Sequence, residues 1–176
     1  LRSVFLFVTI LCCGGGQLFK MAGSAVDSSI AKVGLGPNEV QMVGIMAVRD
    51  DNPTAVVAEI AFAYGDASMA VLSATDANTW FNEREGFCRS YSNQLDVIRV
   101  EVPMGYSALL SELPKKHLLA QSIFVFVRDI GKADITLVAT PWAYVVDGAL
   151  SVLTAPPGAD SSGNTIVAVK GAKSLC

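Results

Sequence analysis

Apolar and polar residues alternate along much of the chain, a pattern that predicts β-strands. In residues 56–64 the sequence VVAEIAFAY gives one face of a strand that is wholly apolar, with Glu59 on the other face. Residues 95–103 (LDVIRVEVP) alternate in the same way, and residues 121–130 (QSIFVFVRDI) are rich in the β-branched and aromatic side chains that strands favour. Further strands are predicted at residues 39–48, which are apolar on both faces, and at residues 135–140, 149–155 and 164–171.

One region interrupts the strands with a helical pattern. Residues 65–91 contain good helix formers, and Asp76 or Asn78 is placed to cap a short helix. This helix would turn Trp80, Phe81 and Phe87 inward. Short strands separated by turn residues, with one helical insertion, predict a mainly β fold of the β-sandwich class.

The first residues of the sequence have a different character. Residues 4–13 form an apolar run behind Arg2. A run of about ten apolar residues is too short to cross roughly 30 Å of hydrocarbon as a helix, but it has the length of the apolar part of an export signal. The alternative is a buried β-strand within the fold. We interpret residues 1–13 as the signal segment.

The end of this run resembles the lipid-attachment signal of bacterial lipoproteins. The compact Cys12 precedes Cys13 at the cleavage position, whereas the bulky Leu11 precedes Cys12. We therefore predict lipidation at Cys13, with Cys12 as the alternative. The three glycines that follow begin a flexible tether, residues 14–37, before a single folded domain at residues 38–176.

Composition narrows the classes of function. With 176 residues, of which 52% are hydrophobic, the chain has enough apolar surface for one domain with a true core. Only 16% of residues are charged and the net charge is −3. Proteins that bind nucleic acids instead carry clustered Lys and Arg side chains that neutralise the phosphates. We therefore expect no nucleic-acid partner.

The residue types that carry catalysis are sparse. His117 is the only histidine, lies beside two lysines and is interpreted as a surface residue. Arg84 and Arg89 flank Cys88 and would favour its thiolate, but a disulfide with Cys176 is the stronger interpretation in an oxidising compartment. The four cysteines have no metal-ligand spacing. We expect no catalytic, metal or cofactor site and no small-molecule substrate.

The order of several short motifs resembles the outer-membrane lipoprotein of the type VI secretion system, the TssJ (SciN) family. A cysteine near the start is followed by DDNPTAVVAEIAF, by the aromatic pair of TWF, by VEVPMG, by FVFVRDI, by ITLVATPW and by GNTIVAV. This order covers most of residues 39–170. The connection TPWAYVVDG departs from the family pattern and is interpreted as a separate contact.

The resemblance implies a transthyretin-like, immunoglobulin-like β-sandwich with a short helical insertion, tethered by lipid to the periplasmic face of the outer membrane. It also implies a non-enzymatic role, in which the domain docks the periplasmic region of an inner-membrane component similar to TssM. In the family, the loop between the first two strands contributes to this contact. Here that loop maps to Arg49, Asp50, Asp51, Asn52, Pro53 and Thr54.

Two other classes of function fit the same sequence. One is a structural β-sandwich subunit of a pilus, capsid or tail, which retains the segment LFVTILCC (residues 6–13) as a strand and pairs it with a neighbouring copy. The other is an enzyme that uses the Cys88 thiol.

Overall fold

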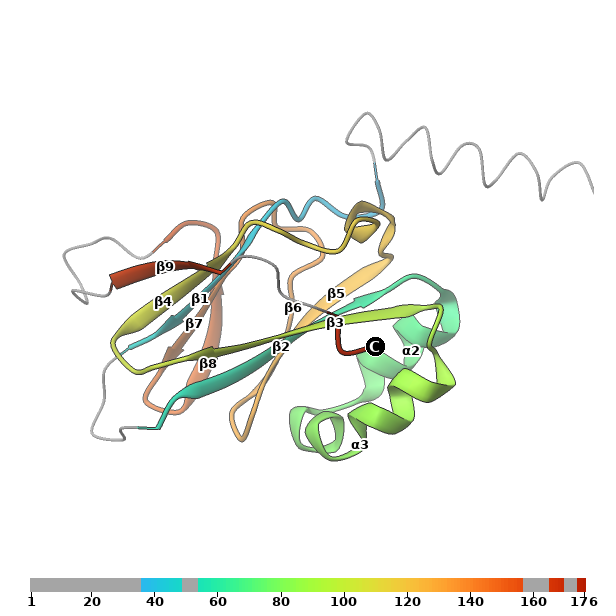
Figure 1. Ribbon diagram of the computed structural model, residues 1–176, viewed down its shortest axis with the longest axis horizontal. Helices are drawn as coiled ribbons and strands as arrows, with labels where there is room; N and C mark the ends of the chain where they lie inside the picture. Colours follow the sequence, from blue (N-terminus) through green and yellow to red (C-terminus); the bar gives the residue numbers. More distant parts are fainter. Residues whose placement is uncertain (1–35, 49–53, 157–164, 170–173) are drawn as a thin grey trace, which may run out of the picture.

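A computed structural model of the chain describes residues 36–48, 54–156, 165–169 and 174–176 (Figure 1). The predicted signal segment with Cys12 and Cys13, residues 14–35 of the predicted tether and residues 49–53 of the predicted partner loop lie outside the described residues. Within the described ranges, no helix has both the length and the apolar character needed to cross a bilayer.

The larger sheet has five strands with mixed pairing. Its order is β8 (Ala149–Leu153), β7 (Trp142–Val146), β1 (Val43–Ala47), β4 (Tyr106–Leu110) and β9 (Thr165–Val169). β1 is parallel to β7 and β4 is parallel to β9, whereas the other neighbours are antiparallel. All five residues of the central β1 are buried, which confirms the prediction of a strand covered on both faces.

The smaller sheet has four strands and is antiparallel throughout. Its order is β3 (Leu95–Val102), β2 (Val56–Ala63), β5 (Ser122–Val127) and β6 (Gly131–Asp134). The strands predicted at residues 56–64, 95–103 and 121–130 are therefore confirmed, with ends that differ by at most three residues.

Two apolar cores lie on opposite faces of the smaller sheet. The main core fills the space between the two sheets and includes Ile45, Ile60, Phe62, Ile98, Leu110 and Val125. Helices α2 (Asp66–Ala74) and α3 (Ala77–Ser90) cover the other face of the smaller sheet (Figure 1), and the helix-side core lies between them and the sheet. It comprises Ala61, Ala63, Leu72, Ala77, Trp80, Leu95, Val97, Phe124 and Phe126. The fold is thus mainly β, with two packed sheets and a helical layer.

The helical region predicted at residues 65–91 is confirmed as two helices with defined starts. The Asp76 carboxylate caps α3 by accepting hydrogen bonds from the Thr79 backbone amide and the Thr79 hydroxyl, each at 2.9 Å. These hydrogen bonds, that of the amide first, lower the pKa of Asp76. At the start of α2, the Ser68 hydroxyl bonds to both the amide and the carbonyl of Gly65.

The strand predicted at residues 135–140 is wrong. The Asp134 carboxylate accepts hydrogen bonds from the amide of Thr136 at 2.9 Å and from its hydroxyl at 2.6 Å. The same hydroxyl oxygen then accepts the Ile123 amide. Side chains that bond to the nearby backbone in this way replace the sheet ladder and favour a turn, so this apolar stretch forms a turn instead of a strand.

The segment TPWAYVVDG contains a strand, where we predicted a connection. Its residues 142–146 form β7, and Trp142 lies opposite Gly44 on the neighbouring β1. A side chain at Gly44 would overlap the indole ring of Trp142, so this glycine is required for the close approach. The alternation predictions also missed β4 and β6.

Candidate functional site

Four connections meet at one end of the sandwich, which we call the loop end. They join β1 to β2, β3 to β4, β5 to β6 and β7 to β8, and the strand register brings them together. Ala47 at the end of β1 lies opposite Tyr106, and its carbonyl accepts the Gly105 amide at 2.9 Å. The β7–β8 turn has positive φ at both Asp147 (48°) and Gly148 (71°), as a two-residue hairpin turn needs. The loop end therefore presents three short turns beside Val48 and Thr54, the described flanks of the β1–β2 connection.

A groove of about 430 Å³ opens at the loop end. Thr54, the described residue of the predicted partner loop, lines it and is exposed. Apart from Thr54, Arg128 and Asp129, the lining side chains are apolar, namely Ala55, Val56, Val57, Met104, Ile130 and Val145, with Gly148 beside them. An apolar groove beside a long loop is suited to contact with another protein.

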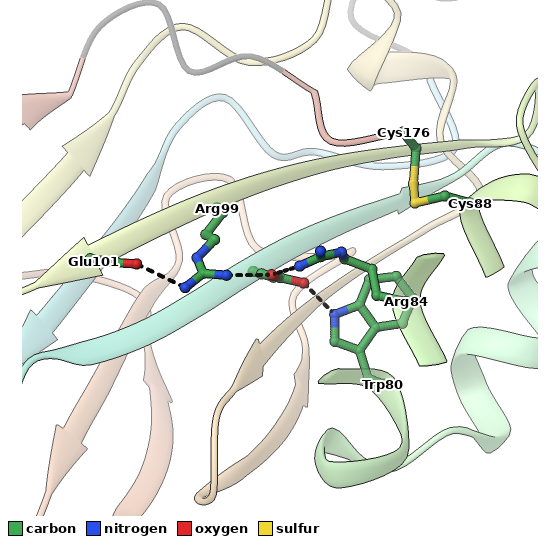
Figure 2. Close-up of polar contacts among 7 residues, drawn as sticks. Trp80, Arg84, Cys88, Arg99, Glu101 and Cys176 are labelled. Carbon is green, nitrogen blue, oxygen red and sulfur yellow. Dashed lines mark hydrogen bonds and ion pairs between the residues drawn. A yellow bond between two sulfur atoms is a disulfide. The ribbon is translucent and has the colours of Figure 1, made fainter. Parts of the chain in front are cut away.

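A buried carboxylate ties α3 to the smaller sheet. Glu59 in the middle of β2 has no exposed surface. Trp80 donates its indole N–H to Glu59 Oε2 at 2.8 Å, and Arg84 donates to Oε1 at 2.6 Å (Figure 2). A buried charge is tolerated only where it is paired and hydrogen-bonded. Because Trp80 and Arg84 are four residues apart on one helix face, their bonds to Glu59 fix the position of α3 over the sheet.

The charged network continues to the edge of the sheet. Arg99 on β3 lies opposite Glu59, with nitrogen and oxygen 3.8 Å apart. Its guanidinium also bonds to Glu101 at 2.8 Å, as Figure 2 shows. The side chains of Arg99 and Glu101 are 32% and 59% exposed, so the network leads from the helix-side core to solvent. Every charge in it has an opposite partner, an arrangement suited to positioning rather than to proton transfer.

Cys88 and Cys176 are joined in a disulfide, with Cα atoms 5.0 Å apart (Figure 2). Cys88 lies one helical turn beyond Arg84 on α3, so both face the smaller sheet. With its sulfur bonded in this way, Cys88 has no thiol to act as a nucleophile. The disulfide interpretation of these two cysteines is the one that the structure shows.

His117 has only in part the surroundings that were predicted for it. It begins the short 3-10 helix His117–Leu119 and is half-buried, with ring Nδ1 2.9 Å from the Pro114 carbonyl oxygen. His117 is thus partly covered, and the interpretation of it as a solvated surface residue is confirmed only in part. In the described parts of the chain, no three His, Cys, Asp or Glu side chains gather in a way that would hold a metal ion.

A polar cluster lies at the end of the sandwich opposite the loop end. The Tyr64 hydroxyl donates to Asp96 at 2.8 Å. The Lys116 ammonium stands 4.1 Å from the centre of the Tyr64 ring and 3.9 Å from the Asp96 carboxylate. Burial, reinforced by the hydrogen bond to Asp96 and its negative charge, raises the pKa of Tyr64. Tyr64 therefore stays neutral, and the cluster closes the rim of the main core.

Comparison of the chain with protein-family models, with curated proteins and with solved structures finds no match. The resemblance to the TssJ family thus rests on the order of short motifs.

Sequence reasoning missed the network around Glu59, although the sequence contains a signal for it. A single carboxylate stands within the apolar stretch VVAEIAFA, and the helical region carries Trp80, Arg84 and Cys88 at intervals of four residues. The carboxylate of the strand can accept hydrogen bonds from the indole and the guanidinium on this helix face. Pairing them from sequence requires knowing that the helix covers this face of the sheet.

Proposed function

We propose that this chain is a non-enzymatic lipoprotein subunit of a bacterial secretion machine of the type VI kind. In this proposal lipid on Cys13 anchors the domain to the periplasmic face of the outer membrane. The β-sandwich is of the transthyretin-like, immunoglobulin-like type, and it docks the periplasmic region of an inner-membrane component similar to TssM through protein–protein contacts.

The observation that carries this proposal is the place of the β1–β2 connection. It runs from the larger sheet to the smaller one, and both of its described flanks, Val48 and Thr54, are at the loop end. Three short turns and an apolar groove therefore lie beside the two described flanks of the loop that the resemblance assigns to the partner contact. A rigid sandwich that presents such a loop is suited to recognition, because the scaffold positions it.

Two further observations support the proposal. Five of the six motifs that carry the resemblance fall on successive elements: DDNPTA lies between β1 and β2, TWF in α3, VEVPMG at the end of β3, FVFVRDI in β5 and its turn, and TIVAV in β9. The sixth, ITLVATPW, forms a turn that leads into β7, where the resemblance implies a strand. The Cys88–Cys176 disulfide is suited to an oxidising compartment such as the periplasm.

A binding measurement tests the proposal. The probe is the purified periplasmic region of the inner-membrane component, and the variant is Asp50→Ala with Asp51→Ala. We expect a Kd at least about tenfold weaker, which corresponds to about 1.4 kcal/mol. The matched control, Glu39→Ala with Asp66→Ala, removes two exposed carboxylates at the opposite end of the strands and leaves the Kd unchanged. Equal affinities for both double variants, or no binding by the parent chain, would contradict the proposal.

A second candidate function is the structural subunit that retains the strand at residues 6–13 and pairs it with a neighbouring copy. One observation favours it. β9 lies at an edge of the larger sheet, has no charged residue or proline, and exposes Ile166 (56%) and Val167 (49%). Natural edge strands are usually protected by charge, proline or a bulge. The two candidates differ in whether residues 1–12 remain on the mature chain.

A further inference from the structure

The segment Ser174–Cys176 covers part of the outer edge of β3, the edge strand of the smaller sheet. Ser174 forms an isolated bridge with Ile98. The Val97 amide donates to the Ser174 hydroxyl at 3.1 Å, and the Leu175 amide donates to the Val97 carbonyl at 2.8 Å. Both backbone groups of Val97 that point away from β2 are thus satisfied by this segment.

By themselves these contacts would not keep the Ser174–Cys176 segment bound to β3. Two hydrogen bonds contribute less free energy than the ordering of three residues costs. Leu175 adds little apolar burial, because it is 44% exposed. Cys176 is different, since it packs against the helix-side core and is bonded to Cys88 on α3. The disulfide is therefore the contact that holds the segment in place.

The sheet edges differ in how they are covered. β6 and β8 contact each other and close one side of the sandwich. Among the described residues, β3 has no neighbouring strand on its outer side, and the Ser174–Cys176 segment supplies the hydrogen-bond partners of the Val97 amide and carbonyl there. An uncovered edge presents free N–H and C=O groups with which another strand can pair.

We propose that Ser174–Cys176 is a redox-latched cap on the edge of β3. In the disulfide form the cap is closed. A dithiol reductant attacks the Cys88–Cys176 bond, forms a mixed disulfide and then closes its own disulfide. Two electrons pass to the protein, and Cys88 and Cys176 each become a thiol with one proton. The segment then leaves β3 and uncovers Val97 while both sheets stay folded. This inference is independent of the proposed secretion role.

Amide hydrogen exchange of the full chain, measured by NMR with and without dithiothreitol, tests the cap. The quantity to follow is the exchange rate of Val97 divided by that of Ile98, whose amide points toward β2 because neighbouring residues alternate in a strand. If both amides exchange only through global unfolding, a change in global stability affects them equally and leaves the ratio unchanged, so a rise in the ratio reports local opening at Val97. We expect it to rise at least about tenfold on reduction. An unchanged ratio would overturn the proposal, because the cap would then open only with the whole domain.

Two sets of variants test whether the change in exchange comes from the Cys88–Cys176 disulfide and from Ser174. Cys88→Ser with Cys176→Ser should show the high ratio without reductant and no response to it, which separates the effect from Cys12 and Cys13. Ser174→Ala in the disulfide form should raise the ratio several-fold, whereas Ser151→Ala, a change at an exposed serine on β8, should leave it unchanged. A double-serine variant with the low ratio of the disulfide form would refute the cap.

Discussion

The two cores of this molecule are held together in different ways. The main core, between the sheets, is a continuous set of apolar side chains from both sheets. The helix-side core is smaller and is fastened by specific links: the Glu59 network, the Cys88–Cys176 disulfide and Lys132, whose ammonium donates to the Leu72 and Ser73 carbonyls at the end of α2. Apolar packing tolerates small shifts, whereas polar and covalent links require one geometry. The helical layer thus depends on particular residues and the sandwich on total burial.

The largest effect is expected from a cavity in the main core. Phe62 is fully buried on β2, so Phe62→Ala should lower the free energy of unfolding by about 3–5 kcal/mol. Urea unfolding measures the change. Leu137→Ala is the control, because Leu137 is 75% exposed, and it should change stability by less than about 0.5 kcal/mol. A similar effect for both variants would contradict the description of the main core.

Loss of the disulfide should be the next largest effect. Cys88 and Cys176 are 88 residues apart in the sequence, so their bond restricts the unfolded chain. Cys88→Ser with Cys176→Ser should lower the free energy of unfolding by about 2–4 kcal/mol. Urea unfolding of both forms, without reductant, measures the difference. A loss below about 0.5 kcal/mol would show that this covalent link adds nothing to the apolar contacts of the helix-side core.

Removal of one charge from the Glu59 network should cost about 2 kcal/mol. In Arg84→Met the buried carboxylate keeps Trp80 and the more distant Arg99, so the cost falls below the 3–5 kcal/mol typical of a broken buried pair. The matched control is Arg89→Met, which breaks the exposed pair between Arg89 and Glu85 and should cost less than about 0.5 kcal/mol.

The double variant Glu59→Leu with Arg84→Met sharpens this test. It removes the buried charge together with its closest partner and should recover stability to within about 1 kcal/mol of the parent chain. If Arg84→Met and Arg89→Met have equal effects on urea unfolding, the network does not fasten α3.

The smallest effect concerns the rim of the main core and depends on pH. Tyr64→Phe removes the hydrogen bond to Asp96 and should cost about 1 kcal/mol at pH 7. The pKa of Tyr64 is raised in the folded protein, so the unfolded chain ionises first, near pH 10. The stability that Tyr64 contributes is therefore complete below about pH 10 and declines above it. Urea midpoints of both chains from pH 7 to 11 should converge above pH 10, and a constant difference would contradict this.

The sequence predicted those elements whose side chains follow a simple period. Alternation found β2, β3 and β5, and the helical insertion was recognised from its helix formers and from Asp76 as a cap. Residues 135–140 have the composition of a strand, but the side chains of Asp134 and Thr136 take over the backbone hydrogen bonds. β6, with the sequence GKAD, has no apolar period and becomes a strand by pairing with β5.

The candidate site was less accessible to sequence reasoning. A disulfide between Cys88 and Cys176 could be proposed from the sequence. The cysteines lack the spacing of metal ligands, and disulfides form readily in an oxidising compartment. The Glu59 network could not be predicted in this way, since its partners come from a helix and a second strand that only the tertiary fold brings together. The loop end was foreseen as one loop, whereas its groove is built from four connections that are distant in the sequence.

The most direct test of the proposed function is the intact mass of the protein extracted from the envelopes of its natural host. The lipoprotein account predicts a mature chain that begins at Cys13 and carries the added mass of its acyl groups. A chain of unmodified mass that retains residues 1–12 would contradict this account and support the structural subunit that pairs through a retained strand.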